Sequence, residues 1–250
     1  MIDQFILKMK RGDNAFYRTL MRTLKAMLHG RLPVPRLLFP ILRVLYAAHF
    51  GVRYSLRWAA NYFYREPLFR SRCETIGKNF HLWLMPEVTG HTRIIIGDRV
   101  SFYGFVGITS GRIFDDPRLV IGNGVDLGHN VSIVVNKEVV IEDDVKIASN
   151  VRIMDTDGHP KDPALRALNL PPGEDEIKAV RIGRRAWIGQ NVFILKGVTI
   201  GEGATIGVNS VVVNDIPAYS VALGNPARVV VKNVLKDAPA PTEAVVRASS

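Results

Sequence analysis

A period of six residues runs through the second half of the chain and limits its folds more than any other feature. Five consecutive steps of six connect large aliphatic residues at Ile182, Ile188, Ile194, Ile200, Ile206 and Val212. The residue after each is most often glycine, and the fifth residue of each unit is most often small. Weaker copies run upstream through Ile121, Leu127 and Ile133, then Ile141, Ile147 and Ile153, with a fainter start at Ile96 and Phe102.

This period fits neither the 3.6 residues of an α-helical turn nor the two-residue alternation of a strand. Short fixed repeats are typical of solenoids. Six residues make one short strand and one tight corner, so three units close a triangular coil whose strands pair with the next coil about 4.8 Å away. We therefore predict a mainly β protein, a parallel β-helix prism with a helical N-terminal region. An ordinary β-sandwich is the alternative, and five unbroken steps disfavour it.

Two interruptions break the register of the repeat. The step from Ile133 to Ile141 is eight residues, which indicates a two-residue insertion. The step from Ile153 to Ile182 is twenty-nine residues, which predicts a loop at 155–181 that leaves the prism. Long loops in compact folds are most often functional or disordered. His159 lies near the start of this excursion loop, among three aspartates.

The positive charge of the chain is concentrated at its N-terminus. Residues 1–70 carry thirteen lysines and arginines against three acidic residues, which equals the net charge of +10 of the whole chain. We predict three parts: a basic amphipathic helical region at 1–72, the β-helix domain at 73–233 and a flexible tail at 234–250. Four prolines are expected to cut the N-terminal region into short helices, at Pro33, Pro35, Pro40 and Pro67.

The basic region has two interpretations that the sequence leaves open. It is a helical lid on one open end of the prism, or it contacts a membrane surface or a partner through residues 1–70. No base-reading motif accompanies the charge, so nucleic acid is not an expected partner. The N-terminus lacks a secretory signal pattern, which predicts a cytoplasmic protein, with a peripheral position at the inner face of the membrane as the variant. The single cysteine, Cys73, excludes an intrachain disulfide.

The stretch from Ile121 to Lys232 resembles the hexapeptide-repeat acyltransferases, and among them the maltose/galactoside O-acetyltransferase group. Three motifs carry the resemblance: "DGHP", "AWIGQNVFILKGVTIGEGATIGVNSVVVNDIP" and "ALGNPARVV", in that order. The resemblance implies a left-handed coil and transfer of an acetyl group from acetyl-CoA to a hydroxyl of a sugar or glycan. It also implies a homotrimer with active sites between neighbouring subunits. Together with the basic N-terminus, it suggests O-acetylation of surface polysaccharide or lipopolysaccharide.

The resemblance also implies roles for individual residues. His159, the histidine of the "HP" pair, would be the general base, because imidazole titrates near neutral pH and can take a proton from a hydroxyl. Asp155 is the preferred orienting partner of its ring, and Asn136, near one coil earlier, is the candidate donor to the oxyanion. Asp157 and Trp187 are expected in the acceptor-binding groove.

Coenzyme A binding is expected along the last coils. Val208 would offer backbone contact to the pantetheine arm, and Arg228 and Lys232 would meet the phosphates. The family often has lysine where this chain has Asn214, so Lys232, Lys196 or Arg185 would have to replace that charge.

The sequence leaves three other functions of the prism open. A zinc-dependent γ-class carbonic anhydrase needs three histidines, and the core repeats hold only His129 and His159, so no metal is expected. An N-acetyltransferase of an amino sugar or another small acceptor would share the base and the donor. A non-catalytic trimeric prism is the third reading, because a fold alone does not prove chemistry.

Overall fold

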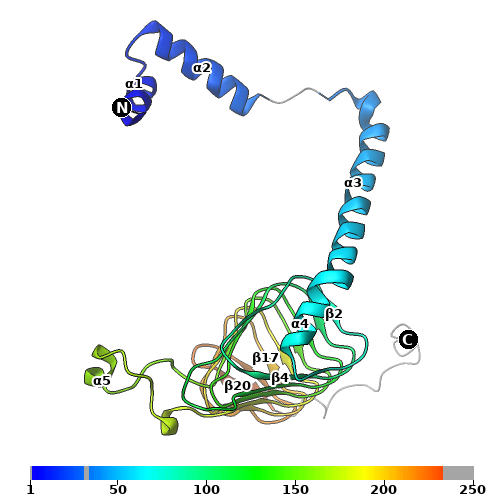
Figure 1. Cartoon of the computed structure of the whole chain (residues 1–250), viewed down its shortest axis with the longest axis vertical. Coiled ribbons are helices and arrows are strands. Elements are labelled where there is room, and N and C mark those ends of the chain that lie inside the picture. The colour runs from blue at the N-terminus through cyan, green and yellow to red at the C-terminus, as the bar shows by residue number, and fades with distance from the viewer. Residues whose placement is uncertain (1, 31–33, 233–250) are drawn as a thin grey trace. The chain divides into compact units, whose positions relative to one another are not determined.

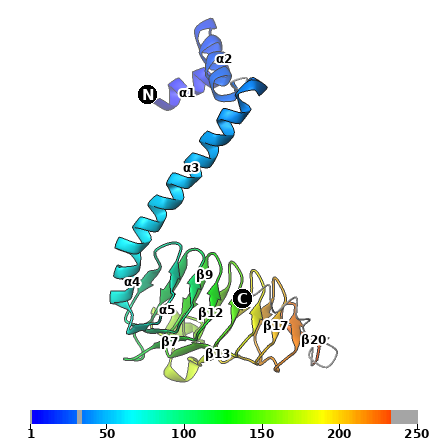
Figure 2. The ribbon, with the colours of Figure 1, turned by 90° about the vertical axis from the view of Figure 1, so that its right-hand side faces the viewer.

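The computed structural model describes residues 2–30 and 34–232, and the predicted tail at 234–250 lies outside them. The chain divides into two compact units, Met1–Leu56 and Arg57–Ser250. The second unit is a three-sided prism of stacked coils, and Figures 1 and 2 show the coils following one another along its axis.

Each side of the prism is one sheet, in which every third strand of the chain pairs with the next. Sheet A contains β1 (Thr75–Ile76), β4 (Arg93–Ile96), β7 (Arg118–Ile121), β10 (Glu138–Ile141), β13 (Val180–Ile182) and β16 (Thr199–Ile200). Sheet B contains β2 (His81–Leu82), β5 (Ser101–Phe102), β8 (Asp126–Leu127), β11 (Lys146–Ile147), β14 (Trp187–Ile188), β17 (Thr205–Ile206), β19 (Val221–Leu223) and β20 (Arg228–Val231). Sheet C contains β3 (Glu87–Thr89), β6 (Val106–Thr109), β9 (Val131–Val134), β12 (Arg152–Met154), β15 (Phe193–Ile194) and β18 (Val211–Val212).

The six-residue repeat sets the register between coils. Ile141 pairs in parallel with Ile121 on one side and Ile182 on the other, so the aliphatic positions stack in columns. These columns form one continuous core whose members are almost fully buried. The predicted left-handed parallel β-helix is confirmed, and the inward positions are the ones that the repeat indicated.

Asparagine builds the corner between sheets B and C. Asn130, Asn150, Asn191 and Asn209 all adopt a left-handed backbone conformation with φ close to +60°. Asparagine tolerates this conformation better than most residues with a side chain. The stacked side chains also bond between coils, since the amides of Asn130 and Asn191 donate to Asn150 at 3.0 Å and Asn209 at 2.9 Å.

The N-terminal end of the prism is covered by the helix α4 (Glu66–Arg72). Phe69 of this helix is buried in the prism core, with its ring 5.8 Å from Phe80 and 5.9 Å from Phe102. Residues 57–72 therefore belong with the prism, although the sequence boundary was expected at 72. The lid interpretation applies to this short segment.

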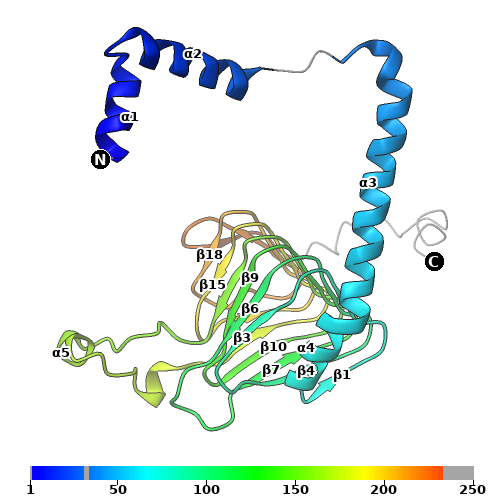
Figure 3. The same ribbon diagram turned by 45° about the horizontal axis from the view of Figure 1, so that its top comes forward.

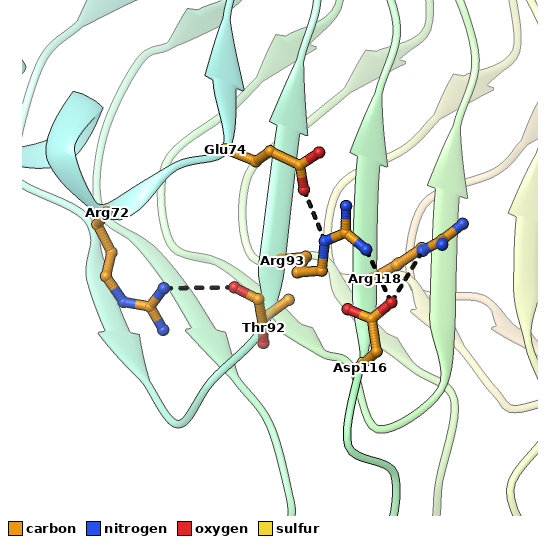
Figure 4. Close-up of polar contacts among 6 residues, drawn as sticks. All are labelled: Arg72, Glu74, Thr92, Arg93, Asp116 and Arg118. Carbon is orange, nitrogen blue, oxygen red and sulfur yellow. Dashed lines mark hydrogen bonds and ion pairs between the residues drawn. The ribbon is translucent and has the colours of Figure 1, made fainter.

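Ion pairs on the outside of sheet A join the first coils (Figure 4). Arg93 binds Glu74 at 2.6 Å and Asp116 at 2.9 Å, and Asp116 also contacts Arg118 at 3.5 Å. Arg72 donates to the carbonyl of Thr92 at 3.4 Å. These exposed contacts align neighbouring strands, and their contribution to stability is small. At the other end, β20 turns back antiparallel on β19 and ends the parallel stack.

The N-terminal region is helical, as predicted. It contains α1 (Ile2–Arg11), α2 (Ala15–His29), the 3₁₀ turn η1 (Arg36–Leu38), α3 (Phe39–Ala60) and the π-helical turn η2 (Asn61–Arg65). The expected breaks at Pro40 and Pro67 are not seen. Pro40 lies in the first turn of α3, where no backbone N–H is needed, and Pro67 continues the helical backbone of η2 into α4. Pro33 lies outside the described residues. Among the described helices, none is both long enough and apolar enough to cross a membrane.

Candidate active site

The excursion loop leaves the prism where sheet C leads into sheet A, which we call the C–A edge. It carries α5 (Pro163–Ala167) and the 3₁₀ turn η3 (Glu174–Glu176), and it extends away from the prism in Figures 1 and 3. Its two ends meet, because the N–H of Lys178 donates to the carbonyl of Asp155 at 3.0 Å. The excursion therefore spans 156–177, slightly less than the predicted 155–181.

His159 lies in an exposed turn at the start of this loop. Gly158 before it has φ +84°, a conformation that favours glycine, and its N–H donates to the buried Thr156 hydroxyl at 3.1 Å. Pro160 after it is buried. Within residues 2–30 and 34–232, the hydrogen bonds include none from the His159 ring. The turn thus fixes the backbone of His159 and leaves both nitrogens of its ring available to bind a ligand.

Contacts on both sides of His159 hold this turn. The carboxylate of Asp157 pairs with the ammonium of Lys196 at 2.5 Å, and Lys196 comes from the same edge one coil later. Arg166 of α5 donates to the carbonyl of Pro160 at 3.0 Å. The N–H of Lys161 donates to Glu176 at 3.0 Å. The turn is therefore tied both to the prism and to the rest of the excursion loop.

Asp155 has different partners from the one predicted. Its carboxylate is buried and accepts the backbone N–H groups of Asn136 at 2.8 Å, Lys137 at 2.6 Å and Glu138 at 3.1 Å. Burial raises the pKa of Asp155 above its ordinary value, and the bonds from these amides oppose that rise. A carboxylate engaged in this way links two coils, and the described contacts include no bond from it to the His159 ring.

Asn136 lies on the C–A edge one coil before His159, as the spacing predicted. It is buried, with 6% of its surface exposed. Its side-chain oxygen occupies the space that a Cβ atom at Gly111 would need. The corner at Gly111, one coil earlier, therefore requires glycine so that Asn136 can approach its backbone. The amide is therefore fixed next to the base of the excursion loop.

The other predicted residues are spread over two edges and a face. Asn214 is exposed on the C–A edge, two coils beyond the coil of His159. Trp187 is 56% exposed on the outer face of sheet B, the side of the prism opposite that edge. Val208 is exposed at the corner between sheets B and C. Arg228 and Lys232 are exposed on and just after β20 in sheet B.

One chain thus groups Asn136, Asp157, His159 and Asn214 on the C–A edge but does not bring Trp187, Val208, Arg228 or Lys232 to it. The replacement charges expected from Lys196 and Arg185 are both engaged, by Asp157 and Glu202. Sequence reasoning missed Arg166 and Glu176 as supports of the His159 turn. The only signal for them was their position inside the long gap in the repeat.

A sequence model described as bacterial transferase hexapeptide (six repeats) matches residues 179–214. The chain is also 42% identical over 168 residues to the galactoside O-acetyltransferase of Escherichia coli (strain K12), and the match covers 66% of this chain and 67% of that one. The chain belongs to the hexapeptide-repeat acyltransferases. It is an enzyme of the acetyl-CoA-dependent O-acetyltransferase type, with acetyl-CoA as co-substrate.

A solved structure agrees with the fold. A variant of AntD, an N-acyltransferase from Bacillus cereus bound to dTDP-4-amino-4,6-dideoxyglucose and coenzyme A, aligns with TM-score 0.52 and 16% identity, covering 70% of this chain and 93% of that one. A galactoside acetyltransferase in complex with coenzyme A aligns with TM-score 0.45 and 28% identity, covering 72% of this chain and 75% of that one. In the described part of the chain, no cluster of three or more histidine, cysteine, aspartate or glutamate residues could hold a metal ion.

Proposed function

We propose that the protein transfers the acetyl group of acetyl-CoA to a hydroxyl of a sugar or glycan, with His159 as the general base. The observation that carries the proposal is the exposed His159 ring, held in a braced turn on the edge of a hexapeptide-repeat prism. The 42% identity to a galactoside O-acetyltransferase supports a sugar hydroxyl as the acceptor.

In the proposed reaction, one ring nitrogen of His159 takes the proton of the acceptor hydroxyl as its oxygen attacks the thioester carbonyl carbon. The carbon–oxygen bond forms, the carbon–sulfur bond breaks, and the imidazolium or solvent gives a proton to the leaving thiolate. General base catalysis of this kind contributes about 10²–10⁴ in rate. Asn136 is our candidate donor to the oxyanion, because it lies on the same edge one coil earlier.

Coenzyme A would bind along the last coils of the prism. We assign its pantetheine arm to the backbone near Val208, a neighbouring polar contact to Asn214, and its phosphates to Arg228 and Lys232. The exposure of the two cations supports this, since neither forms an ion pair with an acid among the described residues. Arginine and lysine are common ligands of phosphate groups.

We propose a homotrimer with each active site between two subunits. The separation of Trp187 from the C–A edge within one chain supports this, because both could line one site only if two chains supplied them.

We assign the enzyme to the cytoplasm, where acetyl-CoA is available. The basic and apolar N-terminal unit suits a membrane on which glycans are assembled, which supports a role in surface polysaccharide or lipopolysaccharide O-acetylation.

An acceptor screen tests the proposal. Purified full-length protein is given acetyl-CoA and a panel of neutral sugars, amino sugars and oligosaccharides, and release of the free thiol is measured with His159→Ala as the control. The expected product is an ester, which hydroxylamine cleaves. An amide product, which resists hydroxylamine, would favour an N-acetyltransferase, and consumption of acetyl-CoA by no acceptor would favour a non-catalytic prism.

A further inference from the structure

The helix α3 has two faces of different chemistry and no acidic residue among its 22 positions. At 100° per residue, Arg43 and Arg53 fall within one stripe, and Tyr46 and Phe50 lie between them. The aromatic rings contact one another along this stripe, with centroids 4.6 Å apart for Tyr46 and Phe50. The guanidinium of Arg53 lies over the Phe50 ring, 5.8 Å from its centroid.

The opposite face of α3 is aliphatic and uncovered by other described residues. Ile41, Val44, Leu45, Val52 and Leu56 form this face, which we call the aliphatic face of α3, and each is between 58% and 68% exposed. Together with the interleaved alanines they form a continuous strip along the helix. Contiguous exposed apolar surfaces often mark sites of interaction with a membrane or a partner, so the face is expected to have an occupant.

The helices α1 and α2 repeat this combination. They carry basic residues at Lys8, Lys10, Arg11, Arg18, Arg22 and Lys25, and exposed apolar residues that include Phe5, Phe16 and Met27. Over residues 1–56, ten lysines and arginines face two acidic residues. An apolar partner alone would not require this charge, and an ordinary protein partner would not match its uniform sign. An anionic surface with an apolar interior matches both features.

We propose that the first unit, residues 1–56, binds in the plane of an anionic lipid bilayer, with the aliphatic face of α3 buried among the acyl chains and its arginines at the lipid headgroups. Amphipathic helices with basic and aromatic residues at their polar boundary bind membranes in this orientation. Binding is expected to fall as salt rises, because part of the attraction is electrostatic.

Vesicle sedimentation with the full-length protein tests the proposal. Vesicles of phosphatidylcholine with and without phosphatidylglycerol are compared at low and high salt. We expect the dissociation constant to be at least about tenfold lower for the anionic vesicles at low salt, and this preference to shrink at high salt. Equal binding to both vesicle types, or no binding to either, would overturn the proposal.

Variants separate the aliphatic face from the charge and from the rest of the surface. Leu45→Glu with Val52→Glu should abolish anionic-vesicle binding, and Arg43→Gln with Arg53→Gln should weaken it severalfold. The matched control is Leu168→Glu, an exposed apolar residue of the excursion loop that should bind like wild type. If the aliphatic face instead packs against a second copy, the Leu45→Glu, Val52→Glu variant would change the mass in solution without vesicles and leave vesicle binding intact.

Membrane binding and acetyl transfer can be tested separately. Vesicle binding needs no turnover, and acetyl transfer can be measured with soluble acceptors without vesicles. Loss of one result therefore leaves the other unaffected.

Discussion

At the residue scale, Asp155 shows how a side chain close to the proposed base can serve the fold. Its carboxylate accepts three consecutive backbone N–H groups from the preceding coil, while its own carbonyl closes the base of the excursion loop. The sequence indicated that Asp155 lies close to His159 but could not identify these partners. Every residue except proline carries a backbone N–H, so the residue types do not show which amides bind a carboxylate.

Asp155→Asn should lower the free energy of unfolding by about 1.5–3 kcal/mol, because the substitution removes a charged acceptor from buried hydrogen bonds. Urea unfolding of the purified protein measures this. Asp126→Asn is the control: its carboxylate pairs with Lys146, which is 53% exposed, so a change below about 1 kcal/mol is expected. Equal effects of the two substitutions would contradict the account of Asp155.

Cys73 gives a pH-dependent prediction. Burial raises the pKa of its thiol to about 12, and the nearby Arg72 and Arg70 oppose the rise. The unfolded chain loses this proton at an ordinary pKa of about 8.5, so the native state holds more protons between that value and 12. The contribution of Cys73 to stability is therefore present below about pH 8.5 and is lost as the pH rises through this window.

Urea unfolding of the wild type and Cys73→Ala at pH 7 and pH 10 checks this. The stability of the wild type relative to the variant should fall from the first pH to the second. A difference that is the same at both values would show that the thiol titrates normally in the folded protein.

At the element scale, the repeat predicted most of the prism and little of the helices. Ile188 and its equivalents could be assigned to the core because a period of six fits a strand and a corner per unit, with one large aliphatic residue facing inward in each unit. The corner at Asn191 was not singled out, because the repeat pattern indicated glycine and other small residues and not asparagine. The expected helix break at Pro40 was wrong, because proline is typical both of a helix break and of the first turn of a helix, and the sequence alone does not separate the two.

The excursion loop should be removable without loss of the prism. Lys178 already bonds to Asp155, so replacing residues 157–176 with two glycines keeps the buried Ile177 and leaves the coil ends joined. We expect the melting temperature to change by less than about 4 °C, equivalent to about 1 kcal/mol for a chain of this size. Acetyl transfer should be abolished, because His159 is lost. A variant that no longer melts cooperatively by circular dichroism would contradict the claim that the prism folds without the excursion loop.

At the scale of the whole molecule, His159 and Trp187 lie on opposite sides of one prism. His159 and Trp187 could both be proposed as site residues from the sequence. Only the arrangement of the sheets shows that one chain does not bring them together. The proposed trimer resolves this, because the C–A edge of one subunit would face sheet B of its neighbour. Closed symmetry would then repeat the same shared site three times.

Mixing two inactive variants tests whether the site is shared. His159→Ala and Trp187→Ala subunits are unfolded together in equal amounts and refolded, and activity is compared with that of each variant alone. Random cyclic trimers should recover roughly one quarter of the wild-type activity, because that share of sites combines an intact histidine with an intact tryptophan. Activity no higher than that of the separate variants would contradict a site built from both subunits.

The most direct test of the central claim is the kcat/KM of acetyl transfer for His159→Ala, measured beside His81→Ala. His81 is an exposed histidine on sheet B in the second unit, so its loss should leave kcat/KM within about twofold of the wild type. Loss of His159 should lower kcat/KM by about 10²–10⁴-fold, with the fold and the subunit number unchanged. Equal activity of the two variants would contradict the assignment of His159 as the base.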